Sequence, residues 1–266
     1  MENFESHWPH WIALGFFIFG TLLGSFANVI IYRLPSGQSV VTPRSRCKSC
    51  GQLIPWYYNI PIFSWIFLRG KCGNCRAPFS VRYPIVEFIM GVLFLLLYQH
   101  YDFQWVTLEY GLFIFGLIVV TFIDFDHYLL PDVFTLSGMV MGLIGAALNP
   151  EREFLDSLLG LLMGGGFLWL VAYLYWVLRK EEGMGGGDIK LLGWIGAVLG
   201  WKSIPFVILI SSVSGSLIGI IMMLKNKGNL KTVIPFGPYI VLGALIYLFG
   251  DENFTQWYTR ILFPNP

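Results

Sequence analysis

Five stretches of the chain contain no charged residue over 18 to 22 positions, and this feature constrains the fold more than any other. A helix needs about 20 predominantly apolar residues to cross the hydrocarbon of a bilayer, so each stretch predicts a transmembrane helix. A water-soluble domain of this size could not bury so much apolar surface, because 56% of the residues are hydrophobic and only 12% are charged. The five stretches are Trp11–Tyr32, Val133–Pro150, Ser157–Leu178, Ser203–Leu224 and Thr232–Gly250.

Three further apolar stretches carry a single charged residue each. Tyr83–Tyr101 contains Glu87 and Phe103–Ile123 contains Glu109, in both cases near the start, where a carboxylate can reach the interface. The third, Ile189–Trp201, is short and follows a glycine-rich loop, so we expect it to enter the membrane partway. Together these patterns predict an all-α polytopic membrane protein with about eight transmembrane helices.

The distribution of lysine and arginine predicts the orientation in the membrane. With eight spans and the N-terminus outside, fourteen basic residues fall on the cytoplasmic side, and Arg152, Lys202 and Arg260 fall outside. Basic residues accumulate on the cytoplasmic side, so this split predicts that the N-terminus and the C-terminus both lie outside. The prediction requires Ile189–Trp201 to be a span, because losing it would invert every later segment. The balance of 17 basic against 16 acidic residues leaves no bulk positive charge for a nucleic-acid partner.

The one long polar segment, residues 34–82, contains four cysteines in two C-x-x-C pairs that are separated by 21 residues. This spacing is close to that of a zinc ribbon, and four thiolates close a tetrahedral structural zinc site. Two disulfides or four free thiols are the alternatives, and a reducing cytoplasm argues against disulfides. Each pair adjoins a glycine, Gly51 or Gly73, as the turns of such metal-binding loops require. The candidate metal ligands are Cys47, Cys50, Cys72 and Cys75.

The polar segment divides the chain into three parts. Residues 1–33 are predicted to form the first transmembrane helix, residues 34–82 a cytoplasmic tetracysteine domain, and residues 83–266 a polytopic membrane domain. The tetracysteine segment contains no acidic residue. This composition favours the headgroups of anionic membrane lipid as its partner over direct attraction of a basic peptide.

Carboxylates from two distant parts of the sequence are predicted to meet at the cytoplasmic interface. One part is the end of the third span, with Asp124, Asp126 and Asp132, and the other is the glycine-rich loop that holds Asp188. Ionisable groups at the membrane are costly and usually functional, and the glycines allow another backbone to approach closely. An aspartyl protease needs two carboxyl groups that share one proton, one to activate water and one to protonate the carbonyl oxygen or the leaving group.

Simpler interpretations of these carboxylates stay open. Asp132, directly before a span, is most simply a helix N-cap, and Asp188 is equally well explained as the N-cap of the sixth span. Asp126 and His127 are explained as readily by exposure to water in a loop. A transporter could use the same groups as a proton relay, so the carboxylates by themselves do not establish proteolysis.

Several short motifs, taken in their order, resemble the type IV prepilin leader peptidases, a family of GxGD membrane aspartyl proteases that are often bifunctional N-methyltransferases. The resemblance covers nearly the whole chain. One departure is Ser137, where the family often has proline, and it concerns helix entry rather than chemistry. The motifs are Gly24–Val29 with Arg33-Leu34-Pro35, both cysteine pairs, Arg82–Glu87, Ile123-Asp124 to Leu130-Pro131-Asp132, Gly185-Gly186-Gly187-Asp188 with Lys190, and Ile234–Tyr239.

The resemblance implies a specific reaction in the bacterial inner membrane, which would place both termini in the periplasm. It implies Asp124 and Asp188 as the catalytic pair of a membrane aspartyl protease domain, and cleavage after a glycine in type IV prepilins or pseudopilins at the cytoplasmic face. S-adenosylmethionine would then methylate the new N-terminus, and Glu87 is the candidate residue for binding that cofactor. The alternative for Glu87 is a structural carboxylate that pairs with a basic residue of the tetracysteine segment.

Two other functions remain as alternatives. A presenilin-like intramembrane protease would share the GxGD motif, but it should cut within the bilayer and would have no reason for the tetracysteine segment. A proton-coupled transporter would need an inverted repeat with broken helices in both halves, whereas a glycine-rich break occurs only once in this sequence.

Overall fold

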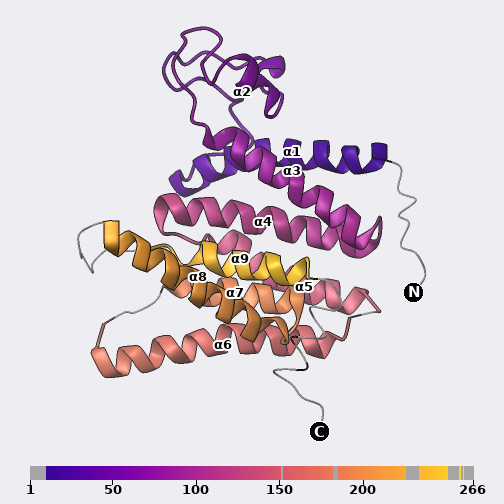
Figure 1. Ribbon diagram of the computed structural model, residues 1–266, viewed down its shortest axis with the longest axis vertical. Coiled ribbons are helices and arrows are strands. Elements are labelled where there is room, and N and C mark those ends of the chain that lie inside the picture. The colour runs from indigo at the N-terminus through magenta and orange to yellow at the C-terminus, as the bar shows by residue number, and fades with distance from the viewer. Residues whose placement is uncertain are drawn as a thin grey trace. The chain divides into compact units, whose positions relative to one another are not determined.

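The structure, a computed structural model, describes residues 10–150, 152–181, 185–225 and 234–250 together with Tyr258 and Arg260. In these ranges the regular structure is helical, apart from two isolated β-bridges in the tetracysteine segment (Figure 1). The all-α fold predicted from the apolar stretches is therefore confirmed. The helices are α1 His10–Arg33, α2 Phe63–Phe67, α3 Arg82–Tyr101, α4 Trp105–His127, α5 Asp132–Leu148, α6 Phe154–Arg179, α7 Gly186–Leu199, α8 Ser203–Lys225 and α9 Gly237–Leu248. Short 3-10 turns cover Leu34–Ser36 and Trp56–Tyr58.

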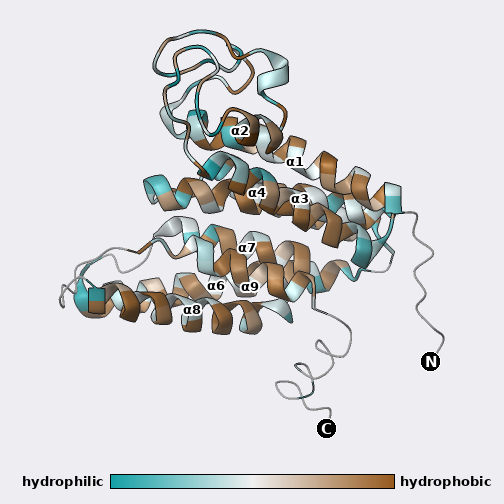
Figure 2. Ribbon diagram, turned by 45° about the horizontal axis from the view of Figure 1, so that its top comes forward, coloured by the Kyte–Doolittle hydropathy of each residue, from teal (hydrophilic) through white to brown (hydrophobic). Residues whose placement is uncertain are grey.

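The helices are apolar along most of their length, as expected for a multi-pass membrane protein (Figure 2). Among the described residues, α1, α3, α4, α6 and α8 are long and apolar enough to cross a membrane. Helices α5, α7 and α9 have 17, 14 and 12 residues. At about 1.5 Å per residue, these three are shorter than the hydrocarbon core is thick. Each of the eight predicted spans corresponds to one helix, and the count of eight full spans stays a prediction.

Two boundaries differ from the prediction in ways that matter for the site. Helix α4 continues past Ile123 to His127, so Asp124 and Asp126 lie in its last turn rather than in a loop. Helix α9 begins at Gly237, followed by Pro238. Residues 232–233, at the start of the predicted last span, lie outside the described residues.

The chain forms two compact units, residues 1–119 and residues 120–266, and α4 contributes to both. In the first unit, α1 and α3 pack closely against each other. A Cβ atom added at Gly24 would lie 2.7 Å from Cα of Glu87, and one added at Gly91 would lie 2.7 Å from Cγ2 of Thr21. Such small residues let helix backbones approach closely, which is how helices associate where lipid removes the hydrophobic driving force.

In the second unit, α7 is the central helix. It packs against α5 and α6, and every residue from Leu191 to Val198 is buried. A Cβ atom at Gly160 of α6 would lie 2.1 Å from the carbonyl oxygen of Gly196 in α7. These glycines let α6 lie against the short helix α7, and the N-terminal turn of α7, which carries Asp188, is thereby fixed within the second unit.

Candidate functional site

Asp124 lies in the last turn of α4, with 5% of its surface exposed. Its Oδ2 atom accepts a hydrogen bond of 3.0 Å from the backbone N–H of Gly237, the first residue of α9. The first N–H groups of a helix have no partner within the helix, and the positive end of its dipole favours a carboxylate. Asp124 therefore satisfies the start of α9 from a position 113 residues earlier in the chain.

Glycine at position 237 leaves room for the carboxylate of Asp124. A Cβ atom there would lie 2.6 Å from Oδ2 of Asp124 and 3.2 Å from Cδ2 of Leu130. The motif Ile234–Tyr239, which had no predicted role, thus supplies the hydrogen-bond donor to Asp124.

Asp188 lies in the first turn of α7, three residues after the N-cap residue Gly185. Its backbone N–H donates to the carbonyl oxygen of Gly185 at 3.2 Å, and its side chain is half-buried. Since Gly185 occupies the N-cap position, the interpretation of Asp188 as an N-cap is wrong. A carboxylate in the first turn still benefits from the helix dipole.

Leu130 connects the surroundings of the two aspartates. It is 8% exposed and lies in the turn between α4 and α5. A Cβ atom at Gly187 would lie 2.8 Å from Cβ of Leu130, so the residue before Asp188 packs directly against this leucine. Leu130 also faces Gly237, the partner of Asp124. The two carboxylates are close enough for the charge of Asp124 to act on Asp188. The structure therefore brings the two predicted catalytic residues together.

Asp132 has a different role from the one predicted. The N-cap of α5 is Pro131, without a side-chain cap, and Asp132 is the first residue inside the helix. Its Oδ1 atom accepts a hydrogen bond of 2.7 Å from Nζ of Lys190, in a salt bridge between α5 and α7. The N-cap prediction for Asp132 is wrong, because proline already supplies the extended backbone at that position.

The four cysteines are also brought together, with all four Sγ atoms within 4.8 Å of one another. Cys47 and Cys72 are buried, whereas Cys50 and Cys75 are exposed. The two pairs fold alike. The N–H of Gly51 donates to the carbonyl oxygen of Cys47, and the N–H of Arg76 donates to the carbonyl oxygen of Cys72. A β-bridge closes each loop, Arg46 with Leu53 and Lys71 with Pro78. The predicted clustering of the cysteines is confirmed.

The turn expected at Gly73 lies elsewhere. Gly51 has a φ of 71°, as the first loop requires, but in the second loop Arg76 takes the equivalent position with a φ of 59°. Gly73 is needed for space, since a Cβ atom there would lie 2.5 Å from Tyr58.

Backbone donors affect the ionisation of the cysteines. The N–H groups of Cys50 and Ser49 lower the pKa of Cys47, and the N–H of Gln52 lowers the pKa of Cys50. The N–H of Ala77 acts in the same direction on Cys75, but desolvation and the neighbouring thiols raise the pKa of Cys75 to about 11. Four close thiols cannot all ionise without a cation to balance their charge.

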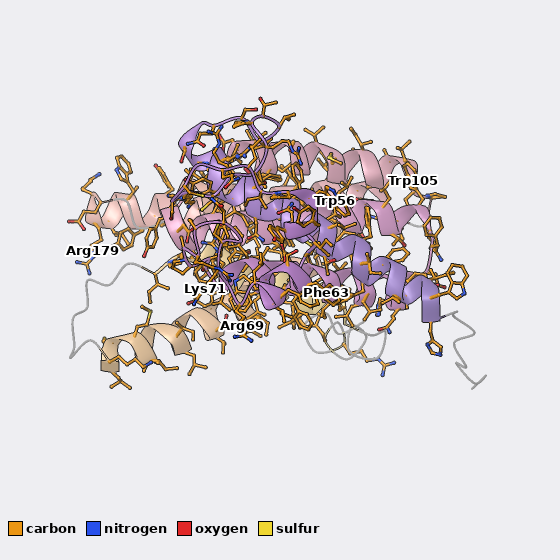
Figure 3. All side chains as sticks on the ribbon, turned by 90° about the horizontal axis from the view of Figure 1, so that it is seen from above. Trp56, Phe63, Arg69, Lys71, Trp105 and Arg179 are labelled. Carbon is orange, nitrogen blue, oxygen red and sulfur yellow. The ribbon has the colours of Figure 1, made fainter. Side chains whose placement is uncertain are left out.

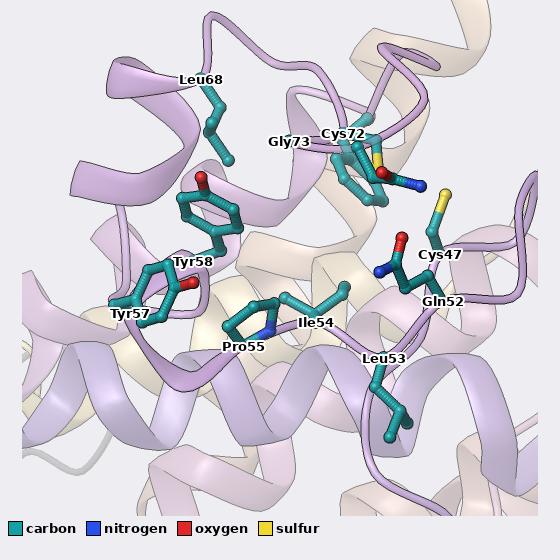
Figure 4. Close-up of a pocket in the computed structure, with 12 residues that line it drawn as sticks. Cys47, Gln52, Leu53, Ile54, Pro55, Tyr57, Tyr58, Leu68, Cys72 and Gly73 are labelled. Carbon is teal, nitrogen blue, oxygen red and sulfur yellow. The ribbon is translucent and has the colours of Figure 1, made fainter.

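A cavity of about 220 Å³ adjoins the cysteine cluster (Figure 4). Cys47 and Cys72 form part of its wall, and the rest is half aromatic rings and amides and half aliphatic residues, proline and glycine. The aromatic and amide residues are Tyr57, Tyr58, Phe79, Gln52 and Asn74.

Glu87 joins the membrane helices to the tetracysteine segment. It lies in the second turn of α3, is 7% exposed, and accepts a 2.7 Å hydrogen bond from the N–H of Ile62 at its Oε2 atom. The hydroxyl of Ser25 in α1 is a second donor. Both donors are uncharged, which differs from the ion pair considered as an alternative. Asn28 links the two membrane helices α1 and α3, since its Nδ2 donates to the carbonyl oxygen of Tyr83 at 3.1 Å.

Comparisons with known proteins agree with this arrangement. The family model of the Bacterial Peptidase A24 N-terminal domain matches residues 18–101, and that of the Type IV leader peptidase family matches residues 111–220. Proteins named prepilin leader peptidase/N-methyltransferase are similar over nearly the whole chain. The one from Stutzerimonas stutzeri is 36% identical, covering 91% of this chain and 92% of its own length. The one from Pseudomonas aeruginosa is 34% identical, covering 98% and 97%. No solved structure matches the chain.

The chain belongs to the type IV leader peptidase family. As a member of this family it is a multi-pass membrane protein. The leader peptidase match covers Asp124 and Asp188, and the N-terminal match covers all four cysteines and Glu87. Gly237 lies beyond both matched ranges.

Proposed function

We propose that this protein is a membrane aspartic endopeptidase that removes the leader peptide from type IV prepilins or pseudopilins at the cytoplasmic face, cleaving after glycine. The observation that carries the proposal is the meeting of Asp124 and Asp188 around Leu130. Family membership supports the same activity and disfavours the presenilin-like protease and the proton-coupled transporter.

In the proposed mechanism, the two carboxyl groups act as one unit that holds a single proton. The ionised member removes a proton from the attacking water, and the protonated member donates to the carbonyl oxygen or to the leaving amine. The Gly237 N–H and the start of α7 hold Asp124 and Asp188 in place during this exchange. Because a helix must be unwound before its backbone can be cut, the boundary between leader and transmembrane helix suits this site.

The tetracysteine segment is proposed to bind one structural zinc ion. Zinc bound to four thiolates at about 2.3 Å would separate neighbouring sulfurs by about 3.8 Å in a tetrahedron. The Sγ atoms of Cys47 and Cys75 are 3.8 Å apart, so the donor set fits the ion. With four protein ligands no open position is left for catalysis, and the role assigned to zinc is to stabilise a segment with a small core.

N-methylation of the new N-terminus is the second proposed activity, and it rests on the names of the relatives. S-adenosylmethionine would supply an electrophilic methyl group for the amine. Glu87 stays the predicted cofactor residue, supported by its position beside Ser25, which comes from a separate motif. The N–H of Ile62 and the hydroxyl of Ser25 would compete with a bound cofactor for this carboxylate.

Purified protein incubated with a prepilin tests the peptidase directly. Asp124→Asn and Asp188→Asn keep the size of the side chain but remove the titratable proton, so each should slow cleavage by about a hundredfold to ten-thousandfold. The matched control is Asp132→Asn, which alters only an exposed salt bridge worth about 0.2–1 kcal/mol and should keep most activity. Near wild-type cleavage by either Asp124→Asn or Asp188→Asn would exclude the dyad and favour the proton-relay transporter.

A further inference from the structure

The tetracysteine segment exposes a group of large apolar side chains that no membrane span explains. Trp56 is 73% exposed, Phe63 63% and Phe67 82%. All lie within residues 56–67, which we call the aromatic segment, and this stretch also exposes Tyr57, Tyr58, Ile60 and Ile66. An apolar patch of this kind marks an interaction surface, and aromatic residues are typical of the membrane interface.

The contact between Ile62 and Glu87 sets the depth of the aromatic segment along α3. Glu87 lies five residues after Arg82, the first residue of the helix. At about 1.5 Å per residue, the level of Glu87 is about 7.5 Å from the helix start. Ile62, in the middle of the aromatic segment, donates to Glu87 at that level. Amphipathic segments that lie in a membrane interface are buried about 5–10 Å into the boundary between headgroups and acyl chains.

The surface of α3 at this level is itself suited to lipid. Ile85 and Phe88, on either side of Glu87 in the sequence, are 44% and 54% exposed. They belong to a helix that is long and apolar enough to cross the membrane. The aromatic segment therefore adjoins a helix surface that lipid covers.

Basic residues follow the aromatic segment. Arg69 and Lys71 are exposed, and residues 34–82 contain no aspartate or glutamate to neutralise them. In Figure 3, Trp56 and Phe63 lie nearer to Trp105, the first residue of α4, than Arg69 and Lys71 do. This order suits aromatic rings that lie deeper in the membrane interface and cationic groups that lie nearer its surface, where long side chains reach lipid phosphates.

We propose that the aromatic segment anchors the tetracysteine domain in the headgroup region of an anionic leaflet, with Arg69 and Lys71 bound to lipid phosphates. The charge favours anionic lipid over a basic leader peptide, which this surface would repel. The anchor restricts the tetracysteine domain to the membrane surface at the end where α1 stops and α3 begins.

Limited trypsin digestion of the full-length protein tests the anchor, since trypsin cuts after Arg69 and Lys71. The protein is placed in detergent, in nanodiscs of phosphatidylcholine, and in nanodiscs containing phosphatidylglycerol. Cleavage at these two residues should be slowest with phosphatidylglycerol. Arg69→Gln is tested by cleavage after Lys71, and Lys71→Gln by cleavage after Arg69. Each substitution should weaken the protection by about fivefold. Lys202→Gln, an exposed lysine outside the tetracysteine domain, should not change it.

A triple variant, Trp56→Ser, Phe63→Ser and Phe67→Ser, should abolish the protection, while Val41→Ser, at an 80% exposed apolar residue of the same domain, should keep it. In detergent, the four thiols of each variant should react at the same rates as those of the wild-type protein. This result establishes that the variant keeps the fold of the domain. Equal cleavage in all three environments would overturn the proposal, as would equal protection by the two lipids. Protection in detergent on adding prepilin alone would instead identify a substrate-docking surface and overturn it too.

Discussion

The carboxylate of Asp124 and the backbone N–H of Gly237 form a buried hydrogen bond of 3.0 Å between the end of α4 and the start of α9. The bond joins two helix ends. It orients a candidate catalytic carboxylate by a backbone N–H group, which every substitution at Gly237 except proline would keep. What a substitution at Gly237 can change is the space around that carboxylate.

Gly237→Ala should therefore damage the site without touching either aspartate. The new Cβ atom would lie 2.6 Å from Oδ2 of Asp124, so the carboxylate must move. We expect prepilin cleavage to fall by about tenfold or more, because catalytic groups misplaced by about 1 Å lose up to a hundredfold. The matched control is Gly219→Ala in α8, where the nearest atom lies 3.6 Å away. Initial rates of cleavage measure both, and similar rates for both variants would contradict the positioning role.

The second prediction concerns the metal. Purified protein should contain about one equivalent of zinc, measured by elemental analysis. Cys47→Ser or Cys75→Ser should remove it and make the tetracysteine segment sensitive to protease, while the membrane helices persist. Ser49→Ala, between two ligands of the same loop, should retain the metal. Acid should also release zinc, because its thiolate ligands then become protonated. Metal-free protein with four freely titratable thiols would reject the site.

The third prediction separates the two activities. Glu87→Ala removes the acceptor for Ile62 and Ser25, so methylation should fall by about tenfold or more while cleavage changes little, since the aspartates lie elsewhere in the chain. Glu87→Gln keeps an acceptor oxygen and separates two roles: retained methylation indicates positioning, and lost methylation indicates a requirement for the charge. Incorporation of a labelled methyl group and the rate of leader removal are measured on the same samples. Equal loss of both activities from folded protein would exclude a separate methylation site.

The fourth prediction tests the orientation in intact cells. Single cysteines introduced at Ser6 and Gln256 should react with an impermeant thiol reagent added outside, and one at Gly228 should not. These three positions lie outside the described residues. Each cysteine is introduced alone into a chain whose four native cysteines are replaced by serine, so that no native thiol contributes to the labelling. Labelling at Gly228 would mean that the predicted number of spans is wrong.

The sequence predicts the helices well because long apolar runs with at most one charge report a local property. Tyr83–Tyr101 and Ser203–Leu224 each match a helix to within one residue at either end. The approach of Asp124 to Asp188 was predictable because the predicted topology puts both helix ends on one side of the membrane. The motif order also pointed to these two residues.

Other contacts between distant segments were not predicted. No local sequence pattern predicts that Gly237 is the partner of Asp124. None predicts that Leu130 packs between Gly187 and Gly237. Asp132 was misassigned because the residue before a helix favours capping, whereas its partner Lys190 is 58 residues away. The recurrence of glycine in short motifs indicated close packing, but it does not identify which segment packs against each glycine.

The packing of α1 against α3 also bears on how the protein is made. Gly24 and Gly91 let the two helices pack directly against each other. This contact does not involve the cysteines in the segment between the helices. The helical hairpin can therefore insert and close during synthesis before the intervening segment acquires any metal. Metal starvation would then leave a membrane-integrated precursor that awaits a late maturation step, rather than a chain that fails to enter the membrane.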